Sequence, residues 1–271
     1  MKYMKYLACA GLLGILSCAS QQDSAEGSYA KSVNPFIGTD FTGNTYPGAQ
    51  SPFGMVQLSP DNGLPGWDRI SGYFYPDSTI SGFSHTHLSG TGAGDLYDIS
   101  FMPVTLPYHE AAAPLGIHSK FSHQNEQAHA GYYKVNLTDY NIDVELTATP
   151  RCGIQRYTFP DAQSAIFLDL KKAMNWDATT DSYIEVVDSV TIRGYRFSEG
   201  WARGQRVYFE TRFSKPFTAV HIDSSAIQSS IDSLTKTTKR IGTAFKARFD
   251  FKTSTGEQVT LSTALSGVSM D

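Results

Sequence analysis

Short runs of alternating apolar and polar residues, separated by turn residues, constrain the fold of this chain most. In one of them Ile142, Val144 and Leu146 alternate with polar residues, the period of two that is typical of a strand with one buried face. Similar runs lie at 132–137, 154–159, 164–170, 183–187, 191–197, 206–213, 217–222, 244–251 and 258–265. Many short strands with turn signals between them favour an all-β fold, an antiparallel β-sandwich.

The first part of the chain is rich in glycine and proline. Eleven of the 23 glycines lie in 37–94, and six of the 12 prolines lie in 35–76. This density excludes long helices and indicates tight loops whose backbone approaches other groups closely. Later in the chain, Ile227, Ile231 and Leu234 recur at helical spacing. We therefore expect a helix over 226–239, although its serines and threonines are weak helix formers.

The composition allows a sizeable core and does not favour a nucleic-acid partner. Apolar residues make up 41% and charged residues 18% of the chain, as in a folded globular protein. The 22 Lys and Arg against 26 Asp and Glu give a formal charge of −4 without a long basic run. A nucleic-acid binder needs a clustered basic face. Aromatic residues, 13% of the chain, suit strands and also stack on sugars.

The first 17 residues have the pattern of a bacterial secretory signal peptide. A short basic start precedes an apolar stretch from Leu7 to Leu16, which is too short to span a bilayer. The sequence Ile-Leu-Ser directly before Cys18 resembles a lipobox, so we expect lipid on Cys18 and a polar tether over 18–30. The chain would then be an exported lipoprotein in the periplasm or at the outer membrane or cell surface. The alternative is an ordinary signal peptide cleaved nearby.

The cysteine count agrees with this interpretation. Of the three cysteines, Cys9 leaves with the signal peptide and Cys18 carries lipid, which leaves Cys152 alone. No disulfide is then possible within the mature chain, although it is exported to an oxidising compartment. We interpret Cys152 as a buried strand residue without a catalytic role.

Residues that suit sugar binding or catalysis concentrate between Trp67 and Asp98. Six of the seven histidines lie in 85–129. On an extended backbone His85 and His87 would share one face, a spacing that suits two metal ligands, two donors to a sugar, or a purely structural pair. Asp95 and Asp98 follow a glycine-rich loop and are candidates for a cleft. Trp67 precedes an acid in a glycine- and proline-rich stretch, and we expect a half-exposed ring, as in sugar sites.

Three other chemistries fit less well. The glycine-rich run at 90–94 lacks the Gly-Lys-Ser/Thr sequence and the βαβ pattern of a phosphate loop. Ser84 and Ser89 lack the Gly-x-Ser-x-Gly elbow of a serine hydrolase. A small zinc hydrolase built on His85, His87 and Asp95 is a remaining alternative.

Several motifs resemble the N-terminal domain of glycoside hydrolase family 92, whose members are bacterial exo-acting α-mannosidases. The three longest are VNPFIGT at 33–39, YPGAQSPFGMVQLSPD at 46–61, and GFSHTHLSGTG at 82–92 with DLYD at 95–98. Shorter matches are SH at 122–123 with Glu126, GYY at 131–133, ELTAT at 145–149 with Arg151, and GWA at 200–202. The resemblance covers residues 31–271, which we expect to form one domain.

The resemblance implies a β-sandwich that packs against a larger C-terminal (α/α)6 barrel. It also implies calcium-dependent, inverting hydrolysis of mannose-containing glycans, including N-glycans. Inversion needs an acid and a base whose carboxyl groups lie about 6.5–9.5 Å apart. In the family these carboxylates and most calcium contacts come from the barrel domain. We expect this domain to be missing here, because the sequence ends directly after a predicted strand. The chain alone would then be a fragment without catalytic carboxylates, and we assign it no metal ligand.

The resemblance also implies a set of sugar-binding residues. Trp67 matches the position whose indole lines the sugar pocket in the family. The residues expected to position mannose beside it are Asp68, Thr86, His87, Gly90, Gly92 and Asp95. The alternative is a non-catalytic, carbohydrate-binding surface lipoprotein that uses the same residues.

Overall fold

The structure, a computed structural model, describes residues 29–113, 115–171, 175–224, 227–230, 238–242 and 245–271. The chain divides into two compact units, one ending at Ser32 and the other running from Val33 to Asp271. In the first unit the described residues form one 3-10 turn, η1 (Tyr29–Ser32). The predicted signal peptide, Cys18 and most of the predicted tether lie outside the described residues. Within the described ranges, no helix has the length and apolar character needed to cross a membrane.

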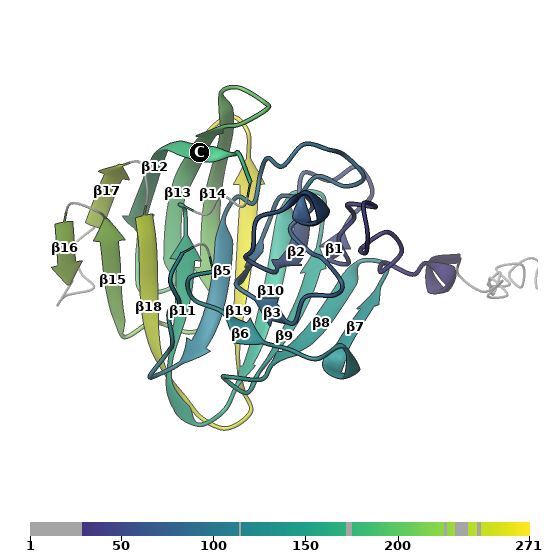
Figure 1. Ribbon diagram of the computed structural model, residues 1–271. Coiled ribbons are helices and arrows are strands. Elements are labelled where there is room, and N and C mark those ends of the chain that lie inside the picture. The colour runs from purple at the N-terminus through teal and green to yellow at the C-terminus, as the bar shows by residue number, and fades with distance from the viewer. Residues whose placement is uncertain (1–28, 114, 172–174, 225–226, 231–237, 243–244) are drawn as a thin grey trace, which may run out of the picture. The chain divides into compact units, whose positions relative to one another are not determined.

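The second unit consists mainly of two large antiparallel sheets (Figure 1). The eight-stranded sheet has the order β1 (Ala49–Gln50), β2 (Gln57–Asp61), β4 (Gly82–Ser84), β5 (Ser100–Thr105), β11 (Ala162–Asp169), β18 (Phe245–Thr253), β15 (Ala219–Ser224) and β16 (Ile227–Ser230). The nine-stranded sheet has the order β17 (Thr238–Gly242), β12 (Ala178–Val186), β13 (Thr191–Glu199), β14 (Gln205–Phe213), β19 (Glu257–Ser266), β10 (Cys152–Phe159), β9 (Ile142–Ala148), β8 (Tyr132–Leu137) and β7 (Glu126–His129). Smaller elements are β3 (Thr79–Ile80) paired with β6 (Ser119–Lys120), η2 (Trp67–Arg69) and η3 (His123–Asn125).

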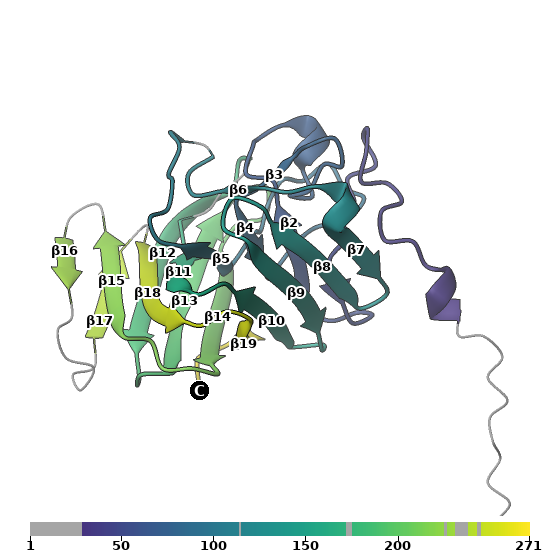
Figure 2. The same cartoon turned by 90° about the horizontal axis from the view of Figure 1, so that it is seen from below.

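The two sheets stack face to face and enclose the core, as Figure 2 shows from below. Phe213 of β14 meets Phe249 and Phe251 of β18 with ring centroids 5.3 and 5.9 Å apart. It also meets Phe101 of β5 at 6.5 Å. These contacts join the nine-stranded sheet to the eight-stranded sheet, which confirms the predicted antiparallel β-sandwich.

The alternating runs correspond to strands β8 to β15, β18 and β19, with ends that shift by up to five residues. The helix expected over 226–239 is wrong where the structure describes it. Residues 227–230 form β16 and residues 238–239 begin β17, and each of these strands pairs with a neighbour. Residues 231–237 lie outside the described residues. In an edge strand, pairing with the neighbouring strand satisfies backbone N–H and C=O groups. A helix would satisfy them too, but a sequence rich in serine and threonine forms helices poorly.

Strands β2 and β4 of the glycine- and proline-rich part, and β5 shortly after it, were not expected from the sequence. In β2, β4 and β5 nearly every residue is buried. Both faces of these strands are covered, so no apolar and polar alternation marks them.

Candidate functional site

The short helix η2 presents Trp67 to solvent. Arg69, at its end, donates from Nε and Nη2 to the two carboxylate oxygens of Asp77, at 2.6 and 2.5 Å. Its guanidinium also lies over the ring of Phe74, 4.7 Å from the centroid. These contacts anchor one end of η2, while Trp67 stays 59% exposed and Asp68 is exposed as well. The exposure expected for Trp67 is therefore confirmed.

The loop of residues 90–95, called the glycine loop below, contacts η2 and the segment that follows β11. A β-carbon on Gly92 would lie 3.2 Å from Cη2 of Trp67, and one on Gly94 would lie 2.6 Å from Cβ of Asn175. Asn175 Oδ1 in turn accepts from the Gly66 N–H at 3.1 Å. A side chain at position 94 would collide with Asn175, so glycine is needed there. At position 92 a side chain would press on the exposed ring of Trp67, which would have to shift slightly.

Asp95 fixes a third segment to the same loop. Its two carboxylate oxygens accept from the backbone N–H groups of Trp201 and Ala202, at 2.9 and 2.6 Å. Trp201 is 79% exposed, and Trp176, which follows Asn175, is 44% exposed. All three tryptophans of the chain are therefore exposed, and each lies on a segment that contacts the glycine loop. We call Trp67, Trp176 and Trp201 the aromatic rim.

A buried ionic network lies beside the glycine loop. Arg196 of β13 is fully buried and donates to Asp98 Oδ1 at 2.5 Å and to Asp177 Oδ2 at 2.9 Å. The other oxygen of Asp98 accepts from Thr86 Oγ1 at 2.7 Å and from Gln205 Nε2 at 3.0 Å. Burial raises the pKa of Asp177 above its ordinary value, although Arg196 acts in the opposite direction. The network joins the glycine-rich part of the chain to the nine-stranded sheet.

His87 takes part in a second buried group. Its Nε2 lies 2.8 Å from Asp61 Oδ1 and 3.1 Å from Ser84 Oγ, and its Nδ1 lies 2.7 Å from the carbonyl oxygen of Gln57. Gly72, at φ +89°, lets the backbone approach this group, since a β-carbon there would lie 2.7 Å from Asp61 Oδ1. His87 is 2% exposed, so it holds neighbouring segments together and does not face solvent.

His85 has a different environment from His87. Its Nδ1–H donates to the carbonyl oxygen of Ile99 at 2.6 Å, and its ring packs edge-on against Phe101. Burial lowers the pKa of His85 to about 4, so the imidazole is neutral at physiological pH. The two histidines therefore serve separate partners. In the described part of the chain His85, His87 and Asp95 do not form a group of three metal ligands.

The backbone after the glycine loop is strained. Leu96, Tyr97 and Ile99 have φ values of +87°, +67° and +54°, in the left-handed region that side chains disfavour. Each such residue costs on the order of 1 kcal/mol and persists only where its surroundings enforce the conformation. The hydrogen bonds of Asp95 and Asp98, which lie in the same stretch of chain, hold the backbone in this conformation. Strain of this kind concentrates at functional sites.

The predicted sugar-binding residues fall into two groups, and their role as sugar contacts stays a prediction. Trp67, Asp68, Gly90 and Gly92 are exposed. Thr86, His87 and Asp95 are buried and hydrogen-bonded to protein groups. Sequence analysis assigned no role to Trp176, Trp201 or Arg196. The signals for the two tryptophans were their rarity, because the chain has three in all, and the place of Trp201 in the GWA match at 200–202.

The implied calcium ion does not fit the described residues. Among them no group of three or more His, Cys, Asp or Glu side chains is placed to hold a metal, whereas Ca²⁺ takes about six to eight oxygen ligands. The carboxylates nearest the glycine loop already accept protein hydrogen bonds. We therefore derive no step through calcium on this chain.

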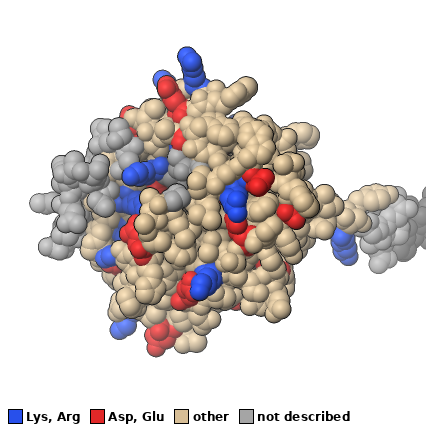
Figure 3. Space-filling view, in the orientation of Figure 1, with Lys and Arg blue, Asp and Glu red and all other residues tan. Residues whose placement is uncertain are grey.

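Cys152 and the surface charge add two further observations. Cys152 is half-buried at the start of β10, and burial raises the pKa of its thiol, which favours the unreactive protonated form. On the face shown in Figure 3, basic and acidic side chains are interspersed among uncharged residues. That face carries no basic patch of the kind that nucleic-acid binding requires.

Comparison with known proteins gives a consistent result. Residues 32–266 match the model of the glycosyl hydrolase family 92 N-terminal domain. The family GH92 α-mannosidase BT3965 from Bacteroides thetaiotaomicron, solved in complex with mannoimidazole, superposes with a TM-score of 0.82 and 37% identity over 89% of this chain and 33% of its own. The family GH92 inverting mannosidase BT2199 from Bacteroides thetaiotaomicron VPI-5482 gives 0.72 and 25% over 89% of this chain and 32% of its own.

A sequence relative carries a less specific name. An uncharacterized secreted glycosidase of Arthroderma benhamiae is 27% identical over 145 residues, which cover 50% of this chain and 18% of the relative. The chain thus spans about a third of the length of the two mannosidases and less than a fifth of the fungal protein.

Proposed function

Since this chain belongs to glycosyl hydrolase family 92, as its N-terminal domain, we propose that it forms one wall of an α-mannosidase site and binds terminal α-mannose of glycans. The observation that carries this proposal is the aromatic rim around the glycine loop. Three exposed indoles on segments that contact one hydrogen-bonded loop have the character of a ligand-binding surface and not of a core.

Each exposed residue of the predicted set has a role in this proposal. The indole face of Trp67 stacks on the C–H face of a pyranose ring, and the carboxylate of Asp68 accepts from sugar hydroxyls. Gly90 and Gly92 let the backbone come close to the sugar, because they carry no side chain. Thr86, His87 and Asp95 act from beneath, by holding the glycine loop and its neighbours in place.

Hydrolysis itself belongs to another domain in this proposal. An inverting glycosidase needs two carboxyl groups about 6.5–9.5 Å apart, one as acid and one as base. We assign neither to this chain. The (α/α)6 barrel that the family resemblance implies would supply both, together with the calcium ion. The chain alone is then expected to bind mannose weakly, because half a cleft buries only one side of a ligand.

Saturation-transfer NMR with mannobiose tests the binding role. We expect millimolar binding at the rim that Trp67→Ala abolishes and Phe53→Ala leaves unchanged, since Phe53 is a fully exposed aromatic residue outside the aromatic rim. Absence of detectable binding would count against the role. A mannosidase assay of the same chain with calcium should show no turnover, and robust turnover would refute the assignment of chemistry to another domain.

We also propose that the chain is exported and anchored through lipid on Cys18. Its lipobox-like sequence supports this, and so does its similarity to a protein named as a secreted glycosidase. Metabolic labelling with a palmitate analogue in a bacterial host is expected to mark the wild-type chain and Cys152→Ser but not Cys18→Ser. Equal labelling of all three, or of none, would exclude the anchor.

A further inference from the structure

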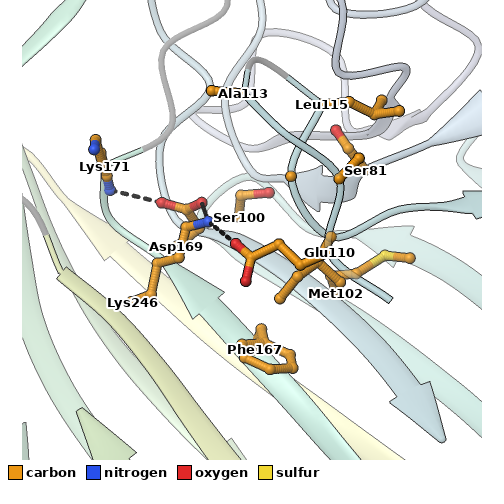
Figure 4. A pocket seen from close by; sticks show the side chains of 13 residues that line it. Ser81, Ser100, Met102, Glu110, Ala113, Leu115, Phe167, Asp169, Lys171 and Lys246 are labelled. Atoms are coloured by element: carbon orange, nitrogen blue, oxygen red, sulfur yellow. Dashed lines mark hydrogen bonds and ion pairs between the residues drawn. The ribbon is translucent and has the colours of Figure 1, made fainter. Parts of the chain in front are cut away.

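A cavity lies on the opposite face of the eight-stranded sheet from the core. In register, Met102 of β5 pairs with Phe167 of β11, while their neighbours Phe101 and Leu168 pair with each other. Phe101 points to the core, where it meets Phe213. Side chains alternate along a strand, so Met102 and Phe167 point the other way. They form the floor of a cavity of about 480 Å³ (Figure 4).

Described residues of the segment between β5 and β6, in 110–113 and 115–117, cover this cavity. Glu110 and Ile117 form an antiparallel bridge, and the Ala111 N–H donates to Gly116 O at 3.0 Å, so the segment closes on itself. Tyr108 of the same segment packs against Phe167 with centroids 5.0 Å apart. None of the lining residues belongs to the aromatic rim or to the glycine loop. The cavity is therefore a separate site.

Charged groups of both signs meet at one end of the cavity. Lys246 Nζ of β18 lies 3.2 Å from Glu110 Oε1 and 3.7 Å from Asp169 Oδ2, which links the covering segment to the sheet. Lys171 stands at the edge (Figure 4). Burial acts to lower the pKa of Lys246, but Asp169 and Glu110 outweigh it and raise the pKa overall. An ammonium carries three N–H donors, so two carboxylate partners leave one for a ligand.

This lining selects the chemistry of a ligand. Two ammonium groups and two carboxylates sum to zero charge, so an anion would face Glu110 and Asp169, and a cation would face Lys171 and Lys246. A hydroxyl group both donates and accepts and is compatible with all four. The ring of Phe167 and the thioether of Met102 add an apolar floor for a C–H face. Small-molecule sites have volumes of about 300–1,000 Å³, and this cavity falls in that range.

We propose that this cavity binds a neutral sugar, a mono- or disaccharide, independently of the aromatic rim. The sugar lies on Phe167, accepts from Lys246 and donates to Glu110 and Asp169. The site would hold a second part of a glycan or a free sugar. It does not rest on the function proposed for the rim.

Binding is measured by saturation-transfer NMR on the Trp67→Ala chain, which lacks the rim indole proposed to stack on mannose. The probes are mannose, glucose, galactose, N-acetylglucosamine, mannobiose and glucuronate. We expect saturable binding of at least one neutral probe. Lys246→Met should weaken it at least tenfold, and Ala113→Trp, which places a ring over the cavity (Figure 4), should abolish it. Lys215→Met removes a lysine of an ion pair elsewhere and should leave binding unchanged.

The outcomes separate the two sites. If no neutral probe binds to the Trp67→Ala chain, or if Lys246→Met and Ala113→Trp both leave binding intact while the chains melt as wild type does, the cavity proposal is wrong. Preference for glucuronate over all neutral probes would also overturn it. If wild type and Trp67→Ala bind alike and Ala113→Trp abolishes the signal, the cavity proposal holds and the rim proposal fails.

Discussion

Two regions of the same domain are held together in different ways. In the sheet half, residues 131–222 and 245–266, backbone groups pair in antiparallel ladders and apolar side chains alternate into the core. In the loop segment, residues 33–98, the strands are short and buried polar side chains bind the backbone instead. Asn62, fully buried, donates to Thr79 O at 2.7 Å and accepts from the Phe74 N–H at 2.5 Å. In the loop segment, single buried polar residues thus satisfy the backbone groups that the strand ladders satisfy in the sheet half.

The difference has a consequence for what each region can present. A ladder residue is tied to the pleat and points either to the core or to solvent. A loop fixed by buried side chains is free of that period, so it can place a large ring outward wherever its backbone allows. Trp67 of the aromatic rim is presented in this way, whereas Trp176 and Trp201 lie on connections between strands of the sheet half. We expect mutations to distinguish two roles. Buried residues hold the loops in place and contribute to stability, whereas exposed rings of the rim face a ligand and contribute to binding.

The largest effect is expected where the two regions are joined. Arg196→Met leaves Asp98 and Asp177 as buried carboxylates without their guanidinium, so the free energy of unfolding should fall by about 3–5 kcal/mol. Urea denaturation measures it. Arg212→Met, on the neighbouring strand and exposed, should change stability by less than about 0.5 kcal/mol. Equal small effects of both substitutions would show that the network does not join the regions.

The pH dependence of stability tests the support contributed by His85. Its pKa is lowered from 6.5 to about 4 in the folded chain, so between these values the unfolded chain binds a proton that the folded chain does not. The neutral ring contributes stability that is fully present above pH 6.5 and is lost as the pH falls toward 4, by up to about 3 kcal/mol. Denaturation of His85→Gln between pH 7 and 4 should show a flatter slope than wild type. His129→Gln, at an exposed position, should keep the wild-type slope.

Two glycines with similar φ values test how tightly the loop segment and the sheet half are packed. Gly72 and Gly256 have φ values of +89° and +76°, so alanine is strained at both. At Gly72 the new β-carbon would also lie 2.7 Å from Asp61 Oδ1, whereas at Gly256 it would meet nothing within 4 Å. Gly72→Ala should therefore cost about 1–3 kcal/mol more than Gly256→Ala in thermal or urea unfolding. A difference near zero would mean that the side chains around His87 can move to make room for the new methyl group.

The smallest effect on stability is expected at the aromatic rim. Trp67, Trp176 and Trp201 are 59%, 44% and 79% exposed, so replacing each by alanine should change the free energy of unfolding by less than about 0.5 kcal/mol. Mannobiose binding at the rim should nonetheless be lost in Trp67→Ala. A rim substitution that destabilised the chain as strongly as Arg196→Met would contradict the separation of support from presentation.

The sequence predicted strands correctly where apolar and polar residues alternate with a period of two. Strands β8 to β15 and β18 to β19 have one face toward the core, so their positions follow from alternation. Strands β2, β4 and β5 have both faces covered and gave no such signal. The helix expected over 226–239 is wrong at residues 227–230 and 238–239, which form the edge strands β16 and β17, because pairing with a neighbouring strand overrides a weak helical preference.

The candidate site was only partly predictable for a related reason. The exposure of Trp67 followed from its immediate neighbours. The attachment of Trp201 to Asp95 spans 106 positions, and that of Arg196 to Asp98 spans 98. No local pattern encodes contacts at such separations, because they exist only after the two sheets have stacked.

The position of the tryptophans also determines what light the protein emits. Because all three indoles of the chain lie exposed around one loop, its tryptophan fluorescence originates at the rim and none of it in the core. Unfolding by urea should therefore shift the emission maximum only slightly, while circular dichroism follows the sheets. Any molecule that covers the rim should instead shift the emission to the blue, so the native chain carries its own optical reporter for that surface.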